Sequence, residues 1–210
     1  MSRPKHAAQR PATFGDVFAV PEFRSLYAAS ALSWVGDYLA RAAVTALVFQ
    51  NTGSVALSAG SFAIGYVSWL TVGPLMSALA ERYPKRTVMV GCDLVRACII
   101  AVVAIPGLPT VGLFVLLFAA SLFNPPFDSA RAALMPGILT GDRYVVAMSV
   151  QNTTLSFATI VGYFVGGTAG SQVPHATLFF DAVTFLASGL LVRFGVRHRP
   201  GATPSLRANL

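Results

Sequence analysis

The chain has 210 residues, of which 55% are hydrophobic and 11% are charged, and its formal net charge is +7. An ordinary soluble domain has about 25% charged residues, and its long apolar segments carry polar faces that are missing here. This composition excludes an ordinary soluble globular protein and predicts an all-α integral membrane protein surrounded by the lipid bilayer.

Residues 1–22 are predicted to form a polar N-terminal tail on the cytoplasmic side. This segment contains Arg3, Lys5 and Arg10. It lacks the short apolar core and the small-residue cleavage site of a secretory signal, so we expect no cleavable signal peptide.

Six apolar segments follow, each with the length and low charge needed to cross about 30 Å of hydrocarbon. The predicted spans are 25–50, 58–80, 87–105, 109–126, 145–170 and 177–196. Together they form a predicted six-helix transmembrane domain at 23–197. Residues 198–210 are predicted to be a second cytoplasmic tail.

Arg41 and Arg96 lie within spans, and the other thirteen of the fifteen Lys and Arg residues lie on one side of the predicted bundle. They gather before span one, between spans two and three, between spans four and five, and at or after the end of span six, whereas the other three connections contain none. Basic loops resist translocation, so both termini are predicted to be cytoplasmic in a multi-pass protein of the cell membrane. The positive net charge is thereby explained without nucleic acid as a partner.

Span one carries two charged residues, Asp37 and Arg41, within "SWVGDYLARAAV". At this spacing they share one helical face, and a charge at mid-bilayer costs about 2.5 to 3.5 kcal/mol. Two interpretations stay open. The pair is either internally neutralised and serves only packing, or it lines a watery cavity where Asp37 carries a proton or meets a cationic substrate.

Span three repeats this pattern with Asp93 and Arg96, which are three residues apart and nearer the cytoplasmic end. We expect them to snorkel to the interface or to pair with the hairpin at 81–86. Asp181 lies near the outer end of span six, where an interfacial or capping role is expected.

Span five contains a row of glycines, Gly162, Gly166 and Gly170, with Gly167 beside it. Small residues at this spacing let another helix approach closely in a membrane. Helix packing alone explains such a groove, and so does a gate that slides or rocks on this surface.

No enzymatic or metal-binding pattern is recognisable in the sequence. The three histidines, His6, His175 and His198, are scattered without ligand spacing, and the two cysteines, Cys92 and Cys98, fit a packing role. Neither a nucleophile elbow nor a phosphate-binding glycine loop is present. We therefore expect no enzyme activity, no cofactor and no metal.

The hairpin "SALAERYPKR" at 77–86 resembles the loop-two motif of the major facilitator superfamily, Gly-x-Leu-Ala-Asp-Arg-x-Gly-Arg-Arg. "FRSLYAASALSWVGD", "NPPFDSARAALMP" and "FFDAVTFLASGLLV" also look like the drug- and siderophore-exporter branch of that family. The run 162–167 is similar to the exporters' Gly-Pro-x-x-Gly-Gly motif, with Tyr163 in place of the proline.

The resemblance implies a secondary transporter that exports a small molecule by alternating access, coupled to protons and without a cofactor. It also implies a cytoplasmic gate latch, whose candidate residues here are Glu81, Arg82, Arg86, Asp93 and Arg96. Ordinary positive-inside charges remain the alternative explanation of this hairpin.

Such transporters have two six-helix halves with the substrate near the midplane between them. The chain resembles the N-terminal half, and 198–210 resembles the start of the linker to a second half. The expected partner is therefore a second six-helix half or a second copy of this chain. The alternative is a truncated or accessory membrane subunit that transports nothing and acts by association.

Overall fold

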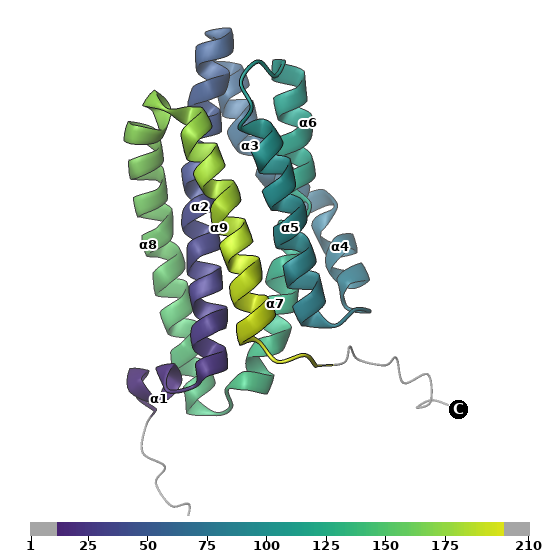
Figure 1. The fold of residues 1–210 in the computed structure, drawn as a ribbon, viewed down its shortest axis with the longest axis vertical. Coiled ribbons are helices and arrows are strands. Elements are labelled where there is room, and N and C mark those ends of the chain that lie inside the picture. Colours follow the sequence, from purple (N-terminus) through teal and green to yellow (C-terminus); the bar gives the residue numbers. More distant parts are fainter. Residues whose placement is uncertain (1–11, 200–210) are drawn as a thin grey trace, which may run out of the picture.

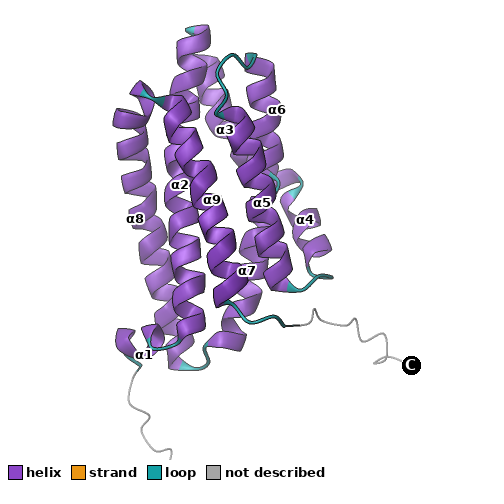
Figure 2. Cartoon of the chain, viewed as in Figure 1, coloured by secondary structure: helices purple, strands orange, loops and turns teal. Residues whose placement is uncertain are grey.

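The computed structural model describes residues 12–199, and the regular structure of this part is entirely helical (Figure 1, Figure 2). Its helices are α1 (Phe14–Phe18), α2 (Pro21–Thr52), α3 (Val55–Thr71), α4 (Gly73–Ala80), α5 (Lys85–Val103), α6 (Thr110–Ser121), α7 (Asn124–Ile138), α8 (Asp142–Gln172) and α9 (Pro174–Gly195). The remaining parts of the two predicted tails, 1–11 and 200–210, lie outside the described residues.

Apart from the short helix α1, the helices form roughly parallel columns (Figure 1). Four columns are the single helices α2, α5, α8 and α9, and the other two are α3 with α4 and α6 with α7. The closest packing joins α2 to α8 and α9, and α9 to α5. The predicted six-helix membrane bundle is confirmed.

Four of these columns are long and apolar enough to cross a membrane by themselves: Pro21–Thr52, Thr110–Ile138, Asp142–Gln172 and Pro174–Gly195. The column of α3 and α4 is divided at Val72, which leaves only a shorter apolar helix. Helix α5 carries two charged residues in its first turn and two more in its middle. The divided column of α3 and α4 and the charged helix α5 thus differ from a plain apolar span. Both border the polar interior described below.

The divisions of the two broken columns lie side by side. In α7, Pro125 and Pro126 occupy the first turn, where a missing N–H is tolerated, so a new helix starts there. A Cβ placed on Gly73 would lie 3.0 Å from the Pro125 Cγ, so the start of α4 packs directly on this turn.

The predicted end of span four at residue 126, with a connection from there to span five at residue 145, is therefore wrong, because the chain stays helical to Ile138. The proline pair reads as a helix breaker in the sequence, yet at this position it begins a helix. As a consequence, Arg131 lies on a helix of the bundle and not in a cytoplasmic loop.

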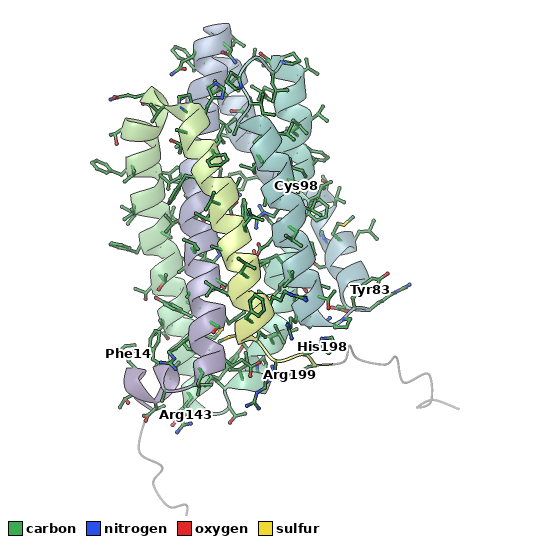
Figure 3. The ribbon with its side chains drawn as sticks, viewed as in Figure 1. Phe14, Tyr83, Cys98, Arg143, His198 and Arg199 are labelled. Atoms are coloured by element: carbon green, nitrogen blue, oxygen red, sulfur yellow. The ribbon has the colours of Figure 1, made fainter. Side chains whose placement is uncertain are left out.

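Both ends of the described chain lie at the same end of the bundle as the α4–α5 and α7–α8 turns (Figure 1). Figure 3 shows Tyr83, Arg143, His198 and Arg199 gathered there. The basic loops predicted from the charge pattern thus share one end. That this end faces the cytoplasm stays a prediction.

The start of the C-terminal tail is bound to the bundle at this end. Arg199 donates hydrogen bonds to both carboxylate oxygens of Glu22, at 2.7 and 3.0 Å, and to the backbone oxygen of Gly137 at 3.2 Å. Part of the predicted N-terminal tail is ordered as well, because α1 begins with a capping box of Thr13 and Asp16. The contacts of Arg199 thus join the end of α9 to α2 and α7.

Helix α8 approaches α2 closely along its glycine row. A Cβ on Gly166 would lie 2.7 Å from the Ala42 Cβ and 2.9 Å from the Leu39 oxygen, and one on Gly162 would clash with Tyr38. Gly170 is buried at the same interface, whereas Gly167 is exposed with nothing within 4 Å of a Cβ. Three of the four predicted groove residues therefore line the α2–α8 contact, and Gly167 lies outside it.

Two hydrophobic clusters fill the interior, one nearer each end of the bundle. On α2, one cluster includes Phe23 and Leu26, and the other includes Val44 and Leu47. On α5 the corresponding residues are Met89 and Ile100. The charged residues in the middle of α2 and α5 lie between these two apolar layers.

Candidate functional site

The centre of the site is an ion pair between Asp37 of α2 and Arg96 of α5. Arg96 donates a hydrogen bond from Nη2 to Asp37 Oδ1. Its guanidinium carbon lies 3.9 Å from the centroid of the Phe185 ring, and the residue is only 2% exposed. The Asp37 side chain is 22% exposed, so the pair has one buried and one partly accessible member.

This arrangement corrects two expectations from the sequence. Asp37 pairs with Arg96 and not with Arg41, although Arg41 shares its helical face. Arg96 does not snorkel or reach the 81–86 hairpin, because its position on α5 faces α2 and α9. Spacing along one helix predicted which charged residues share a face, whereas the packing of separate helices decides which of them pair.

Two further carboxylates flank Arg96. Asp93 Oδ1 lies 4.0 Å from Arg96 Nη1, and neither of its buried oxygens has a hydrogen-bond partner among the described residues. Asp181 is 1% exposed, and its Oδ1 lies 3.2 Å from the Thr184 hydroxyl. The interfacial position expected for Asp181 is therefore wrong, because this residue faces the interior.

Gly36 makes this position of Asp181 possible. A Cβ on Gly36 would clash with the Asp181 carboxylate and with the Thr184 hydroxyl. The absent side chain lets the acidic face of α9 reach the middle of α2, so that three carboxylates from three helices gather near one guanidinium.

Arg41 is held by aromatic rings. Its guanidinium carbon lies 5.8 Å from the ring centroids of both Tyr38 and Tyr66. A Cβ on Gly65 would lie 3.4 Å from Arg41 Nη1, so the guanidinium rests on α3 at a position without a side chain. No ion pair with Arg41 occurs within residues 12–199.

A cleft of about 370 Å³ opens beside these residues. Its wall is built from helices α2, α3, α5, α7 and α8, and its lining includes Trp34, Asp37, Tyr38, Arg41, Tyr66, Arg96, Phe127 and Arg131. A smaller cavity of about 60 Å³ lies against the same charged centre and is lined by Asp37, Arg41, Arg96 and Asp181, among others. The cleft combines aromatic surface with charge, which suits an amphipathic small molecule.

The sequence did not predict the role of Arg131 in this wall. Its guanidinium donates to Gln151 at 2.6 Å and to Asp128 at 3.2 Å, and it lies 4.9 Å from the Trp34 ring. The sequence did contain a signal for this contact. Asp128 and Arg131 are three residues apart, so they share one face if this segment is recognised as a helix.

The residues proposed for the latch fall into two separate places. Glu81 and Arg82 are exposed in the turn before α5, and Arg86 donates a hydrogen bond to the backbone oxygen of Arg193. Asp93 and Arg96 lie farther along α5, in the central cluster, roughly 10 to 15 Å away at about 1.5 Å of helix rise per residue. The structure therefore does not bring the five residues together.

Within residues 12–199 no group of three or more His, Cys, Asp or Glu side chains has the arrangement of a metal site. The chemistry that this centre supports is the binding, pairing and exchange of protons and charged groups in a partly dry interior.

Comparison with known proteins points to membrane transport. Residues 26–209 match the family model described as Major Facilitator Superfamily. Macrolide efflux protein A of Streptococcus pyogenes is 22% identical over 144 residues, which are 67% of this chain and 36% of that protein. The uncharacterized MFS-type transporter YkuC of Bacillus subtilis (strain 168) is 28% identical over 127 residues, which are 57% of this chain and 28% of that protein. The match thus spans about a third of the length of these curated relatives.

Proposed function

Because this chain belongs to the Major Facilitator Superfamily, we propose that it forms one half of a secondary active transporter that exports a small molecule by alternating access. The observation that carries this proposal is the cleft beside the Asp37–Arg96 pair. A buried charged pair in a membrane protein is costly to keep and marks a pathway for substrate or ions by default.

The driving force in this proposal is a proton gradient. Asp37 is the coupling residue, because its carboxylate borders the cleft and forms the ion pair that one proton would break. Protonated Asp37 no longer attracts Arg96, so proton binding changes the forces between α2 and α5. Alternating access needs such a difference in free energy between two arrangements of the helices.

The cleft needs a second wall in this proposal. Transporters of this architecture hold their substrate between two six-helix halves, and the open side of the cleft carries Asp37, Arg41 and Tyr66. These groups are poorly solvated by lipid. The partner that covers them is a second six-helix half or a second copy of this chain arranged as a parallel pair.

The substrate class is an amphipathic small molecule. Macrolide efflux protein A provides the first probe, since its name states that it exports macrolides. The aromatic groups Trp34, Tyr38, Tyr66 and Phe127 line the cleft and would contact the apolar body of such a molecule.

The test is uptake of a labelled macrolide into inverted membrane vesicles that contain this chain. We expect accumulation when the vesicle interior is acidified and loss of accumulation when a protonophore is added. Vesicles with the Asp37→Asn variant are the matched control. Equal uptake with and without the chain would contradict export of macrolides, and absence of any proton-driven movement of a panel of amphipathic compounds would favour an accessory subunit.

A further inference from the structure

We propose that Arg41 binds an acidic group of the exported molecule, so that the substrate class is an amphipathic anion with an apolar body. This role of Arg41 rests on the proposed export function and narrows its substrate class. Binding at equilibrium can be measured without transport, so the anion site and the export function can fail separately.

Arg41 differs from the other two arginines of the cleft in its lack of a carboxylate partner. Arg41, Arg96 and Arg131 all line the cleft of about 370 Å³. Arg96 is paired with Asp37, and Arg131 lies 3.2 Å from an oxygen of Asp128. The Arg41 guanidinium forms no ion pair and no hydrogen bond with any residue between 12 and 199. Its charge is therefore available to a ligand.

Two carboxylates near Arg41 are held elsewhere. Asp37 is paired with Arg96. The Asp181 carboxylate packs on Gly36, which precedes Arg41 by five residues, or about 7.5 Å along the helix axis at about 1.5 Å per residue. No Asp181 oxygen lies within 4 Å of an Arg41 nitrogen. Neither carboxylate is thus in contact with this guanidinium.

The guanidinium of Arg41 is oriented by groups that leave its N–H donors unused. Its carbon lies 5.8 Å from the ring centroids of Tyr38 and Tyr66, and aromatic faces attract a cation through their quadrupole. A Cβ on Gly65 would lie 3.4 Å from Nη1 and 3.5 Å from Nη2. The head group therefore rests on α3 at a position where a side chain is missing, with its donors free to meet a ligand.

A guanidinium with free donors in a partly dry interior recognises an acidic group. Its fork of N–H groups matches the two oxygens of a carboxylate, and such charge-assisted pairs are stronger than neutral hydrogen bonds. A charge at this depth is costly without a partner. Trp34 and Phe127 line the same cleft and would contact the apolar body of the ligand. The cleft therefore suits an aromatic carboxylate better than a neutral molecule of the same shape.

The depth of Arg41 favours a small amphiphile over the headgroup of an anionic lipid. Arg41 lies 11 residues before the end of α2 at Thr52, or about 16 Å at about 1.5 Å per residue. Lipid headgroups lie at the membrane surface, roughly 15 Å from the centre of the hydrocarbon core. A headgroup would have to leave that surface to reach the guanidinium, whereas a small molecule needs only to enter the cleft.

Equilibrium binding of two matched probes to the purified full chain tests the anion site. The chain is held in nanodiscs of zwitterionic lipid, and empty nanodiscs give the background from partition into lipid. The probes are 2-naphthoate, which carries a carboxylate, and 2-naphthamide, its neutral counterpart of nearly the same shape. We expect naphthoate to bind about tenfold more tightly or better, because only the anion forms a charge-assisted pair.

Arg41→Gln should remove this preference. Naphthoate binding should weaken about tenfold or more, while unchanged naphthamide binding reports an intact cleft. Arg143→Gln is the matched control, because Arg143 is exposed in the first turn of α8, and it should keep the preference. If circular dichroism shows that Arg41→Gln does not fold, Arg41→Lys replaces it. Lysine keeps the charge but loses the fork, so the preference should be reduced.

Equal binding of the two probes to the parental chain would overturn the inference. A preference that persists in folded Arg41→Gln, or an equal loss of both probes in it, would do the same. Complete loss of naphthoate binding when phosphatidylglycerol is added to the nanodiscs would identify a lipid headgroup as the occupant and exclude the small amphiphile.

The two proposals give different results when only one of them is correct. If the carboxylate preference depends on Arg41 but no compound is exported, the anion site stands and the export function fails. If export is measured without any preference for acidic compounds, the export function stands and the anion site fails.

Discussion

Arg96 keeps its charge inside the bundle because Asp37 approaches it from the neighbouring helix and Phe185 covers its face. Removing one partner of a buried ion pair leaves the other charge without compensation, which costs far more than the pair itself contributes. The same reasoning applies to Arg131, which donates hydrogen bonds to Asp128 and Gln151. At the scale of single residues, the site consists of charges that each depend on a particular neighbour.

Replacing Arg96 with glutamine should lower the free energy of unfolding by about 3 to 5 kcal/mol, because Asp37 loses its cation in a buried site. Unfolding in mixed detergent, followed by circular dichroism, measures this change. Arg82→Gln is the control, since Arg82 is exposed in the turn before α5 and its loss should stay within about 0.5 kcal/mol. Equal stability of both variants would mean that the central pair contributes nothing to the fold.

At the scale of helices, the packing of α8 on α2 depends on three glycines. Their missing side chains bring the two backbones close enough for Gly166 to meet the Leu39 oxygen. Close approach of this kind is how helices associate tightly in a membrane, where no hydrophobic force drives them together. The contact fixes one wall of the cleft.

Gly166→Ala should destabilise the protein by about 1 to 3 kcal/mol, the usual cost of an added methyl group in a well-packed interface. The neighbouring Gly167→Ala is the matched control, because a Cβ there meets nothing within 4 Å. Thermal unfolding of both variants in the same detergent gives the comparison. A larger loss in Gly167→Ala than in Gly166→Ala would show that α8 packs with a different face.

The turn before α5 provides the second test at this scale. Glu81 and Arg82 are exposed, so Glu81→Ala and Arg82→Ala should change the rate of transport with little effect on membrane insertion. A tenfold change in the ratio of two conformations requires only about 1.4 kcal/mol. Labelling of single cysteines at the cytoplasmic mouth measures the ratio, and parental labelling in both variants would exclude a latch.

The helices themselves were largely predictable, and the connections between them were not. Long apolar runs predict α2, α8 and α9 within a few residues, because length and hydropathy are local properties. The start of α7 was missed since two prolines also terminate helices, and with it the position of Arg131 was missed. The pairing of Asp37 with Arg96 depends on residues 59 positions apart, and no local pattern contains that information.

At the scale of the whole molecule, the bundle places both described chain ends with the basic turns at one end (Figure 1). We predict that this end faces the cytoplasm, because basic loops are retained there. The matches span about a third of the length of the curated relatives, so the substrate and the second wall of the cleft are proposals.

Reporter fusions test the orientation. Fusions after residues 84, 140 and 205 should report the cytoplasm, and those after residues 53, 107 and 173 should report the outside, because every predicted cytoplasmic connection carries basic residues. A cytoplasmic signal at 53 or 173 would contradict the six-span orientation.

The most direct test of proton-coupled transport is to measure proton movement caused by substrate. The measurement uses liposomes that contain the purified chain and a pH-sensitive dye. With an imposed proton gradient, adding a transported compound should accelerate the internal pH change, because the proposed mechanism couples export and proton movement at the Asp37–Arg96 pair. Folded Asp37→Asn should abolish the acceleration, since asparagine keeps the size of the side chain but cannot carry a proton. Substrate-dependent proton movement that persists unchanged in Asp37→Asn would contradict the central role of this pair.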